Sequence, residues 1–411
     1  MALPLVRDHF PGVQKCIFFE TSAWGLIPGA ARDALNRCID LQIDGDFDKD
    51  VAGDAIERVR AKFATLVRAA PDEIAIVKNV SEGVNAVVAS LLWQAGDNAV
   101  ICSDVDHPNC IYALYNVRDR YGVEIRSVAA RDFHVPIDEL INAIDGRTRL
   151  VLAPSVPFST GLRTDIRRIG TACRERSVPF FVDGAQSVGA LDMDAEAEYI
   201  DALTVASSKY LCGPHGIGFL YVRRAWAEQM QPAYLARYSI DLGSLHEGDA
   251  GGERYDLKSA AGRFDIGSYN YAAASAVEVS LDLLLACGTR AIERHVLALS
   301  HRFASELQSL GLPLLARQPG PHLSQVVLVG GVESKHDRAA LASLYQHLHS
   351  NRVKLSLRRG RLRFSFHFYN DDQEVTQGLS LIRDWIRHNR NIQKLGRCPH
   401  DLPPVTLPAS G

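Results

Sequence analysis

The sequence predicts an α/β protein, with a mostly parallel sheet in a large domain and a smaller C-terminal α+β domain. From about residue 57 to 222, short apolar runs alternate with helical patterns. Several of these runs are apolar at every position, which is typical of strands covered on both faces. After residue 271, long helical patterns enclose only two strand-like runs, which indicates a different and smaller layer.

The elements are expected in the following order. The strands of the large domain are EIAIV (73–77), NAVICS (98–103), LVLAPSV (150–156), PFFVD (179–183), ALTVAS (202–207) and GIGFLYV (216–222), with helices at 55–69, 81–94 and 165–177. The smaller domain has a long helical pattern over 275–310, strand-like SQVVLVG (324–330), a helix near 340–350, strand-like LRFSFHFY (362–369) and a final helix near 374–389.

Four segments are predicted from these patterns. Residues 1–20 form an N-terminal segment that packs with the small domain, 21–270 the large domain, 271–395 the small domain and 396–411 an irregular, proline-rich tail. The polar, glycine-rich stretch at 242–263 is too irregular for a simple connector. It is interpreted as a lid, a subunit-contact loop or an unstructured segment.

Composition and residue spacing argue against nucleic-acid binding, membrane insertion, export and metal binding. The 411 residues carry a formal net charge of −3, which gives no basic footprint for nucleic acid. No stretch approaches the 18 apolar residues of a membrane span, and MALPLVRDHF lacks the apolar core of a signal peptide. The eight cysteines are scattered without a C-x-x-C pair, so reduced thiols, a cytoplasmic location and no metal site are expected.

Lys209 and Asp183 carry the chemistry that the sequence predicts. Lys209 lies in VASSKYLCGPHGIGFLYV (205–222) and Asp183 in VDGAQSVG (182–189), each at the end of a short apolar run. Pyridoxal 5'-phosphate (PLP) needs a lysine that forms an imine with its aldehyde and an acid that pairs with its pyridinium nitrogen. The two residues therefore predict a PLP enzyme with Lys209 and Asp183 in catalytic roles.

These runs and six further blocks resemble the class V aminotransferase family of fold type I PLP enzymes. The similarity extends over residues 17 to 390, and is strongest to the branch with cysteine desulfurases, selenocysteine lyases and isopenicillin N epimerase-like proteins. It implies a fold type I PLP-dependent transferase with a seven-stranded type of sheet. It also implies a homodimer with shared active sites.

The resemblance assigns most of the cofactor site. Ser81 and Glu82, in SEGVN (81–85), correspond to the loop that holds the PLP phosphate, mainly through backbone N–H groups. His107, in DVDHPNC (104–110), corresponds to the imidazole that stacks on the pyridine ring and can act in catalysis. Gln186 is placed to hydrogen-bond the phenolic oxygen.

Two serines are expected at the phosphate as well. The family's Ser-Gly-His-Lys is replaced here by Ala206, Ser207, Ser208 and Lys209, so Ser208 is expected to bind the phosphate instead. Ser268, in FDIGSYN (264–270), corresponds to the hydroxyl residue that reaches the cofactor of the neighbouring subunit.

The substrate side is assigned to three blocks. Arg363, before SFHFYN, matches the family's arginine that grips the substrate α-carboxylate, a contact for which the planar guanidinium is suited. Ser22, Ala23 and Trp24, in FFETSAWGLIP (18–28), are candidates for lining the pocket. Phe158, in VPFSTG (156–161), falls near the cofactor ring.

One part of the desulfurase pattern is missing. Desulfurases carry a nucleophilic cysteine on a loop before the carboxylate-binding arginine, whereas here RRGRLRFSF passes directly from Gly360 to Arg363. A protein persulfide is therefore disfavoured. The predicted reaction is β-elimination, a carbon–sulfur lyase activity on a cysteine-derived amino acid, with epimerisation or transamination of an amino acid as the alternative. A non-catalytic binding protein with the PLP fold is a minor alternative.

Overall fold

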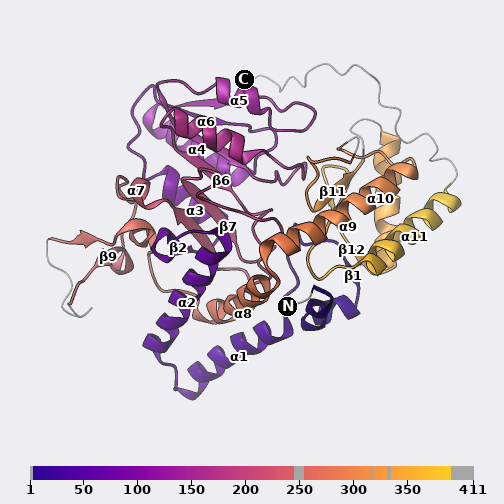
Figure 1. Ribbon diagram of the computed structural model, residues 1–411, viewed down its shortest axis with the longest axis horizontal. Coiled ribbons are helices and arrows are strands. Elements are labelled where there is room, and N and C mark those ends of the chain that lie inside the picture. The colour runs from indigo at the N-terminus through magenta and orange to yellow at the C-terminus, as the bar shows by residue number, and fades with distance from the viewer. Residues whose placement is uncertain (1–2, 245–253, 317–318, 331–334, 390–411) are drawn as a thin grey trace.

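The computed structural model describes residues 3–244, 254–316, 319–330 and 335–389. Its largest sheet has seven strands in the order β2-β8-β7-β6-β5-β3-β4. Three of these strands, β2, β7 and β6, are labelled in Figure 1. Only β8 runs antiparallel to its neighbours, which confirms the mostly parallel α/β sheet. The strands are β2 (Ile74–Val77), β3 (Asn98–Ile101), β4 (Glu124–Ser127), β5 (Thr148–Pro154), β6 (Phe180–Asp183), β7 (Ala202–Ala206) and β8 (Gly218–Val222).

Helices cover both faces of this sheet. Along β6, Phe180 and Val182 belong to one buried cluster and Phe181 to another, as the alternation of side chains in a strand requires. The first cluster includes side chains of α2 (Lys49–Val67), α6 (Ile166–Glu175) and α8 (Tyr271–Cys287), and the second includes those of α3 (Val80–Val88), α4 (Pro108–Tyr121) and α7 (Arg224–Ala227). Burial on both faces explains why these strands are apolar throughout.

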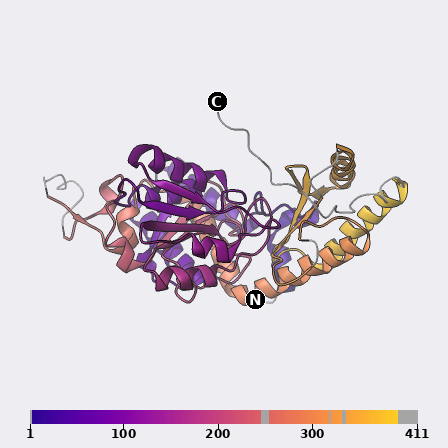
Figure 2. The same cartoon turned by 90° about the horizontal axis from the view of Figure 1, so that it is seen from above.

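The C-terminal elements form a second, smaller layer beside the first (Figure 2). Its antiparallel sheet has the order β11-β14-β13, and its own apolar cluster packs that sheet against helices. The elements are β11 (Val326–Val329), β13 (Ser356–Arg358), β14 (Arg361–Ser365), α9 (Thr289–Ser309), α10 (Lys335–Ser350) and α11 (Asp372–His388). The expected strand 362–369 is shorter than predicted, because the chain turns after Ser365.

The long helical pattern over 275–310 is two helices. They meet at Gly288, which has φ +80°, and are bent by 82° there. Taken together they match the length and composition of a membrane span, but no single helix among the described residues does.

The remaining elements lie at the periphery. Strand β1 (Ile17–Phe18) pairs with β12 (Val353–Lys354), so the N-terminal segment reaches the C-terminal layer. Strands β9 (Ile240–Asp241) and β10 (Asp256–Leu257) pair in an arm that extends from the body (Figure 1). Two further helices are α1 (Gly29–Asp44) and α5 (Ile137–Asn142). Residues 245–253 of the 242–263 stretch and the tail 396–411 lie outside the described residues.

Candidate active site

Asp183 and Lys209 follow neighbouring parallel strands at the same edge of the large sheet. Asp183 is the last residue of β6, and Lys209 comes three residues after β7 ends at Ala206. Burial lowers the pKa of Lys209, the Asp183 carboxylate opposes that shift, and Arg363 adds to it. Ligands of α/β sheets bind at the carboxyl ends of the strands, where these side chains meet.

One carboxylate oxygen of Asp183 is available to a strong hydrogen-bond donor. Its Oδ1 accepts a hydrogen bond from the backbone N–H of Ala185 at 2.9 Å. Among the described residues, its Oδ2 accepts only from the thiol of Cys110 at 3.8 Å, which is a weak donor. A protonated ring nitrogen would be a stronger partner for that oxygen.

Gln186 connects the Asp183 turn to the N-terminal loop. Its side-chain Nε2 donates to the Ser22 carbonyl at 3.0 Å, and its Oε1 is buried without a hydrogen-bond partner. One N–H of the amide is therefore used and the other is free to meet a ligand.

His107 begins helix α4 and faces Phe158. Its Nδ1 accepts a hydrogen bond from the backbone N–H of Asn109 at 3.2 Å, which caps the helix. The His107 and Phe158 rings meet edge to face, with centroids 4.7 Å apart. Burial lowers the pKa of His107, and so favours its neutral form.

At the start of α3, Ser81 and Glu82, which were predicted to hold the phosphate together, have different hydrogen bonds. Asn79, not Ser81, caps the helix, and its side chain accepts from the backbone N–H of Glu82 at 3.0 Å. That N–H is already bonded, whereas Val80 and Ser81 lie in the first turn, where N–H groups have no partner inside the helix. The carboxylate of Glu82 accepts from the backbone of Lys78. An anion here would meet Ser81 rather than the N–H of Glu82.

The two serines before Lys209 have different environments. Ser207 is fully buried, and its hydroxyl hydrogen-bonds the carbonyls of Pro214 and Ile217. The hydroxyl of Ser208 is not committed in this way among the described residues, and the Ser208 carbonyl accepts from the N–H of Gly25 at 2.8 Å. Ser208 is therefore the better placed of the two to contact a phosphate.

Arg363 comes from the C-terminal layer and reaches the same site. It is 3% exposed, and it donates to the Ser356 hydroxyl and to the Phe158 carbonyl, each at 3.1 Å. Burial lowers its pKa to about 10, so it remains a cation at neutral pH. Arg363 thus contacts Phe158, and Phe158 in turn contacts His107.

The N-terminal loop closes one side of the site. Ser22 is 2% exposed, its N–H donates to the Ser365 hydroxyl at 2.9 Å, and its own hydroxyl is buried without a partner. Ala23 follows in the same turn. Trp24 is 45% exposed and packs edge to face on Phe18, so its ring is partly open to solvent.

Ser268 is the predicted site residue that is expected to act on a neighbouring subunit. It is exposed, with φ +46°, in the loop that leads into α8. Within one chain no contact joins it to Lys209 or Asp183 among the hydrogen bonds of the described residues. The expected contact to a neighbouring subunit stays a prediction.

Comparison with known proteins identifies the family. The model of "Aminotransferase class-V" matches residues 48–377. The chain belongs to the class V aminotransferase family. It is a PLP enzyme by that membership, and the residues present fit the cofactor. Asp183 has an oxygen available for a cationic donor, and the side-chain amine of Lys209 forms no hydrogen bond or ion pair with other described residues, although its backbone carbonyl accepts from Cys212.

Relatives and solved structures agree with this family. An uncharacterised aminotransferase, YcbU of Bacillus subtilis, is 27% identical and covers 91% of this chain and 98% of its own length. A probable cysteine desulfurase of Methanothermobacter thermautotrophicus is 26% identical, over 78% of this chain and 81% of its own. The apo cysteine desulfurase of Thermococcus onnurineus has a TM-score of 0.82 at 22% identity, covering 94% and 99%. The cystine C-S lyase C-DES, in complex with cysteine persulfide, has a TM-score of 0.80 at 24% identity, covering 91% and 99%. These structures establish the fold type I PLP architecture.

The turn before Arg363 is short. Strands β13 and β14 pair directly, with Arg358 opposite Arg361, so only Arg359 and Gly360 connect them. Both have positive φ, +48° and +77°, as a tight two-residue hairpin turn requires. No cysteine-bearing loop stands between the strands.

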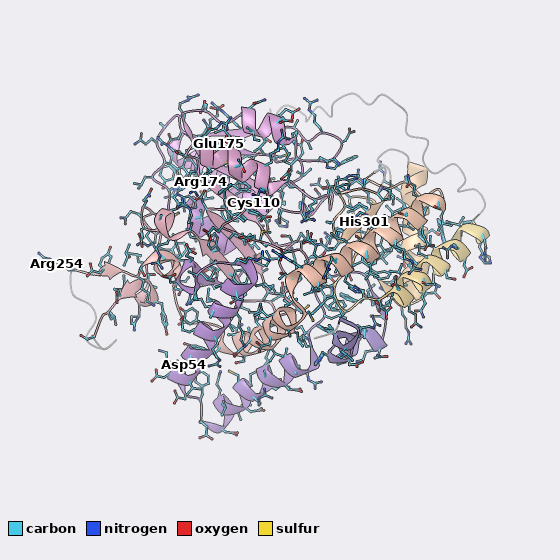
Figure 3. All side chains as sticks on the ribbon, viewed as in Figure 1. Asp54, Cys110, Arg174, Glu175, Arg254 and His301 are labelled. Atoms are coloured by element: carbon cyan, nitrogen blue, oxygen red, sulfur yellow. The ribbon has the colours of Figure 1, made fainter. Side chains whose placement is uncertain are left out.

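Several contributors to the site were missed by the sequence analysis. Asp106 is 2% exposed, and both its carboxylate oxygens lack a hydrogen-bond partner. Burial and the nearby Asp183 raise the pKa of Asp106 well above its ordinary value. Cys110, in the first turn of α4 (Figure 3), is buried against the Asp183 carboxylate, which together with burial raises the pKa of its thiol. The acidic residue next to His107 in DVDHPNC was a signal for Asp106.

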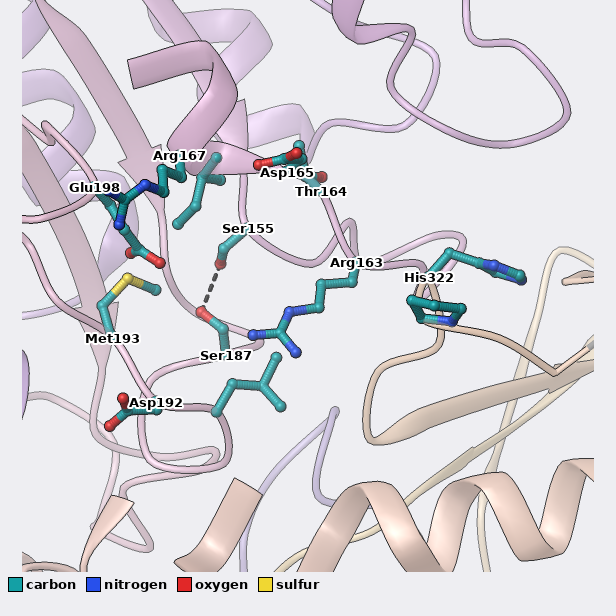
Figure 4. Close-up of a pocket in the computed structure, with 13 residues that line it drawn as sticks. Ser155, Arg163, Thr164, Asp165, Arg167, Ser187, Asp192, Met193, Glu198 and His322 are labelled. Atoms are coloured by element: carbon teal, nitrogen blue, oxygen red, sulfur yellow. Dashed lines mark hydrogen bonds between the residues drawn. The ribbon is translucent and has the colours of Figure 1, made fainter. Parts of the chain in front are cut away.

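A separate cavity of about 410 Å³ lies behind the Asp183 turn (Figure 4). Ser155 and Ser187 line it, their hydroxyls are 2.5 Å apart, and the Ser155 N–H donates to the Asp183 carbonyl at 3.0 Å. Its Arg163 forms an ion pair with Glu293 at 2.6 Å. None of the predicted site residues lines this cavity, so it is distinct from the cofactor site.

Gly25 offers a test of how the N-terminal loop holds the lysine loop. A Cβ atom at this position would lie 2.1 Å from the Lys209 carbonyl oxygen. We expect Gly25→Ala to lower the free energy of unfolding by about 1–3 kcal/mol and to weaken cofactor retention, because the backbones must separate. Thermal denaturation of the holoenzyme measures the first effect, and the cofactor content after dialysis measures the second.

Gly53→Ala in α2 is the control. With open space around it, this substitution should be neutral or stabilising by about 0.5–1 kcal/mol. Equal melting temperatures for the two variants would contradict the argument.

Proposed function

We propose that this PLP enzyme is a carbon–sulfur lyase, which eliminates the sulfur substituent from Cβ of a cysteine-derived amino acid without a protein persulfide. The two-residue turn at Arg359 and Gly360 carries this proposal, because it leaves no place for a persulfide-forming cysteine beside Arg363. Among the described cysteines, five are buried, and only Cys16 and Cys287 are partly exposed. A further support is that a similar structure, C-DES, is named a cystine C-S lyase.

The residues of the cofactor site are proposed to divide the work as follows. Asp183 would bind the pyridinium N–H, Gln186 would donate to the phenolic oxygen, His107 would pack on the ring, and Ser81 and Ser208 would contact the phosphate. Bound PLP supplies an electron sink for the electron pair left when the Cα–H bond breaks. Ser268 is proposed to complete the phosphate site of the other subunit in a homodimer, and its exposure agrees with that role.

Lys209 is proposed to move the proton. Its amine would act as the base that takes the proton from Cα of the substrate. Burial lowers its pKa, which increases the neutral fraction that a base requires. Arg363 fixes the α-carboxylate with two parallel N–H donors and so orients the Cα–H bond. With a sulfur substituent on Cβ, the products are a thiol, pyruvate and ammonium, with one water consumed.

Transamination or epimerisation is the second candidate. The uncharacterised aminotransferase of Bacillus subtilis, similar over 91% of this chain, favours it. The same Lys209 and Arg363 serve these reactions, which differ in where the proton returns. A non-catalytic role is disfavoured by the presence of Lys209, Asp183 and Gln186 together.

Product analysis distinguishes these reactions. Purified holoenzyme is incubated with a panel of L-amino acids that includes L-cystine and S-substituted L-cysteines, with and without an added keto acid. The proposal expects pyruvate, ammonia and a thiol or persulfide from the sulfur-containing members alone, independent of the keto acid. Formation of a new amino acid only when the keto acid is present would establish an aminotransferase, and an inverted α-centre an epimerase.

The cysteines provide a prediction that separates this chain from a desulfurase. Replacement of Cys16 and Cys287 by Ser, singly and together, is expected to leave kcat/KM within about tenfold, because no thiol takes up the sulfur. A variant without any of the eight cysteines should behave likewise wherever circular dichroism shows that it folds, since buried thiols also contribute packing. Loss of turnover in one single variant that still binds PLP would reveal a nucleophile.

A further inference from the structure

One face of the β13–β14 hairpin presents a row of polar side chains to the active site. Side chains alternate along a strand, so Ser356 and Arg358 share a face with their cross-strand partners, Arg363 and Arg361, and with Ser365. The contacts of this face show where it points: Arg363 donates to the Phe158 carbonyl, and Ser365 accepts from the N–H of Ser22. Arg358 is thus the diagonal neighbour of the proposed carboxylate anchor.

The arginines of this hairpin are not equivalent. Arg361 is 9% exposed, and its guanidinium lies over the Phe133 ring at 5.0 Å from the centroid, so it is committed to packing. Arg358 and Arg359 are both exposed, and no ion pair joins either to an acid in the described parts of the chain. Arg359 lies over the ring of Phe158 at 5.9 Å.

Phe158 connects these cations to the reacting centre. Its carbonyl accepts from Arg363, one side of its ring meets His107 at 4.7 Å, and Arg359 lies over the ring. A substrate whose α-carboxylate is on Arg363 would therefore have the exposed Arg358 and Arg359 nearby. Arg358 is also close enough to Lys209 and Arg363 to disfavour their protonated forms.

The hairpin contains no acidic residue that could balance the positive charge of its arginines. The carboxylate of Glu20 interacts electrostatically with Arg358 and Arg363, but it forms no ion pair with either within 4.0 Å among the described residues. Burial raises the pKa of Glu20, which further weakens its ability to neutralise two cations. Guanidinium groups without a partner beside a pocket attract an anion, and can bind it with two parallel N–H donors.

We propose that Arg358 and Arg359 form a second anion subsite, which selects amino acids carrying an acidic group at the distal end of the side chain. This inference rests on the proposed function, in which Arg363 holds the α-carboxylate, and it names the substrate class: cysteine thioethers or disulfides whose sulfur substituent ends in a carboxylate. The short turn that excludes a persulfide loop also places these two arginines where a distal carboxylate arrives.

A pair of substrates that differ in one charge tests the subsite. S-carboxymethyl-L-cysteine and S-carbamoylmethyl-L-cysteine have nearly the same shape, and only the first ends in an anion. Wild-type holoenzyme is expected to favour the acid by about tenfold or more in kcat/KM, because each guanidinium adds a charge-assisted hydrogen bond. The ratio should fall to about one in the double variant Arg358→Gln/Arg359→Gln. Arg387→Gln, on the exposed side of α11, is the matched control and should keep the wild-type ratio. A wild-type ratio near one, or a ratio unchanged in the double variant, would overturn the subsite.

A binding measurement separates failure of the subsite from failure of the lyase. The change in cofactor absorbance on adding L-glutamate or L-glutamine gives their dissociation constants, and requires no sulfur chemistry. A preference for glutamate that is lost in the double variant, with neither thioether cleaved, supports the subsite and refutes the lyase. Cleavage of both thioethers at equal rates, with equal binding of the two amino acids, refutes the subsite and retains the lyase.

Discussion

Lys209→Ala is expected to reduce turnover by about 10³-fold or more, because in the proposed mechanism one side chain both holds the cofactor and moves the substrate proton. The variant should still bind PLP, although more weakly, since the contacts from Asp183, Gln186 and the first turn of α3 do not involve Lys209. Dialysis followed by measurement of cofactor content gives the loss of affinity. Single-turnover assays with the substrate found by product analysis give the loss of rate.

Reductive labelling tests the same assignment without any substrate. Borohydride treatment of wild-type holoenzyme should fix PLP onto Lys209, which mass spectrometry of a digest locates. Lys258→Ala is the matched control, because Lys258 lies on the peripheral β9–β10 arm and its N–H bonds Ser239 rather than a site residue. Label on Lys258, or label that persists in Lys209→Ala, would contradict the assignment.

The buried strands could be predicted from the sequence because every one of their residues contributes to a core. Residues of β6 divide between the clusters on the two faces, which leaves an uninterrupted apolar run to recognise. Strand β4 (Glu124–Ser127) gave no such signal, since it is at the edge of the sheet and two of its four residues are exposed. Helix α1 was missed for a similar reason, with only three buried residues in sixteen.

In the site too, some features could be predicted from the sequence and others could not. Lys209 and Asp183 follow strands that a linear pattern locates, so their proximity follows from the parallel sheet. The contacts that position Arg363 join residues that are distant in sequence, such as its bond to Phe158, and no periodicity encodes them. The sequence likewise could not separate the neighbouring arginines of the hairpin, of which Arg361 is buried against Phe133 whereas Arg358 is exposed.

Arg363→Ala is expected to lower kcat/KM by about 10²-fold or more, with the cofactor absorbance unchanged. In the variant, the substrate carboxylate loses its charge-assisted pair with Arg363, a cation that is 3% exposed. The loss of such a buried pair costs about 2–4 kcal/mol of binding free energy in the transition state. Arg363 touches Ser356 and Phe158 but none of the residues proposed to hold PLP, so cofactor binding should survive. Steady-state kinetics on the substrate found by product analysis, with absorbance spectra, measures both effects.

Comparing Arg363→Lys with Arg363→Ala separates the contribution of the planar guanidinium from that of its positive charge. Arg363→Lys keeps a cation but loses the planar pair of donors, so it should recover only part of the activity. Arg361 is unsuitable as a solvent-exposed control, because its removal would disturb the packing on Phe133, whereas Arg387→Ala changes a guanidinium that is remote from the site. If Arg363→Ala retained wild-type kcat/KM, the α-carboxylate would have to be bound elsewhere. The amino-acid lyase, the aminotransferase and the epimerase would then lose the same anchor together.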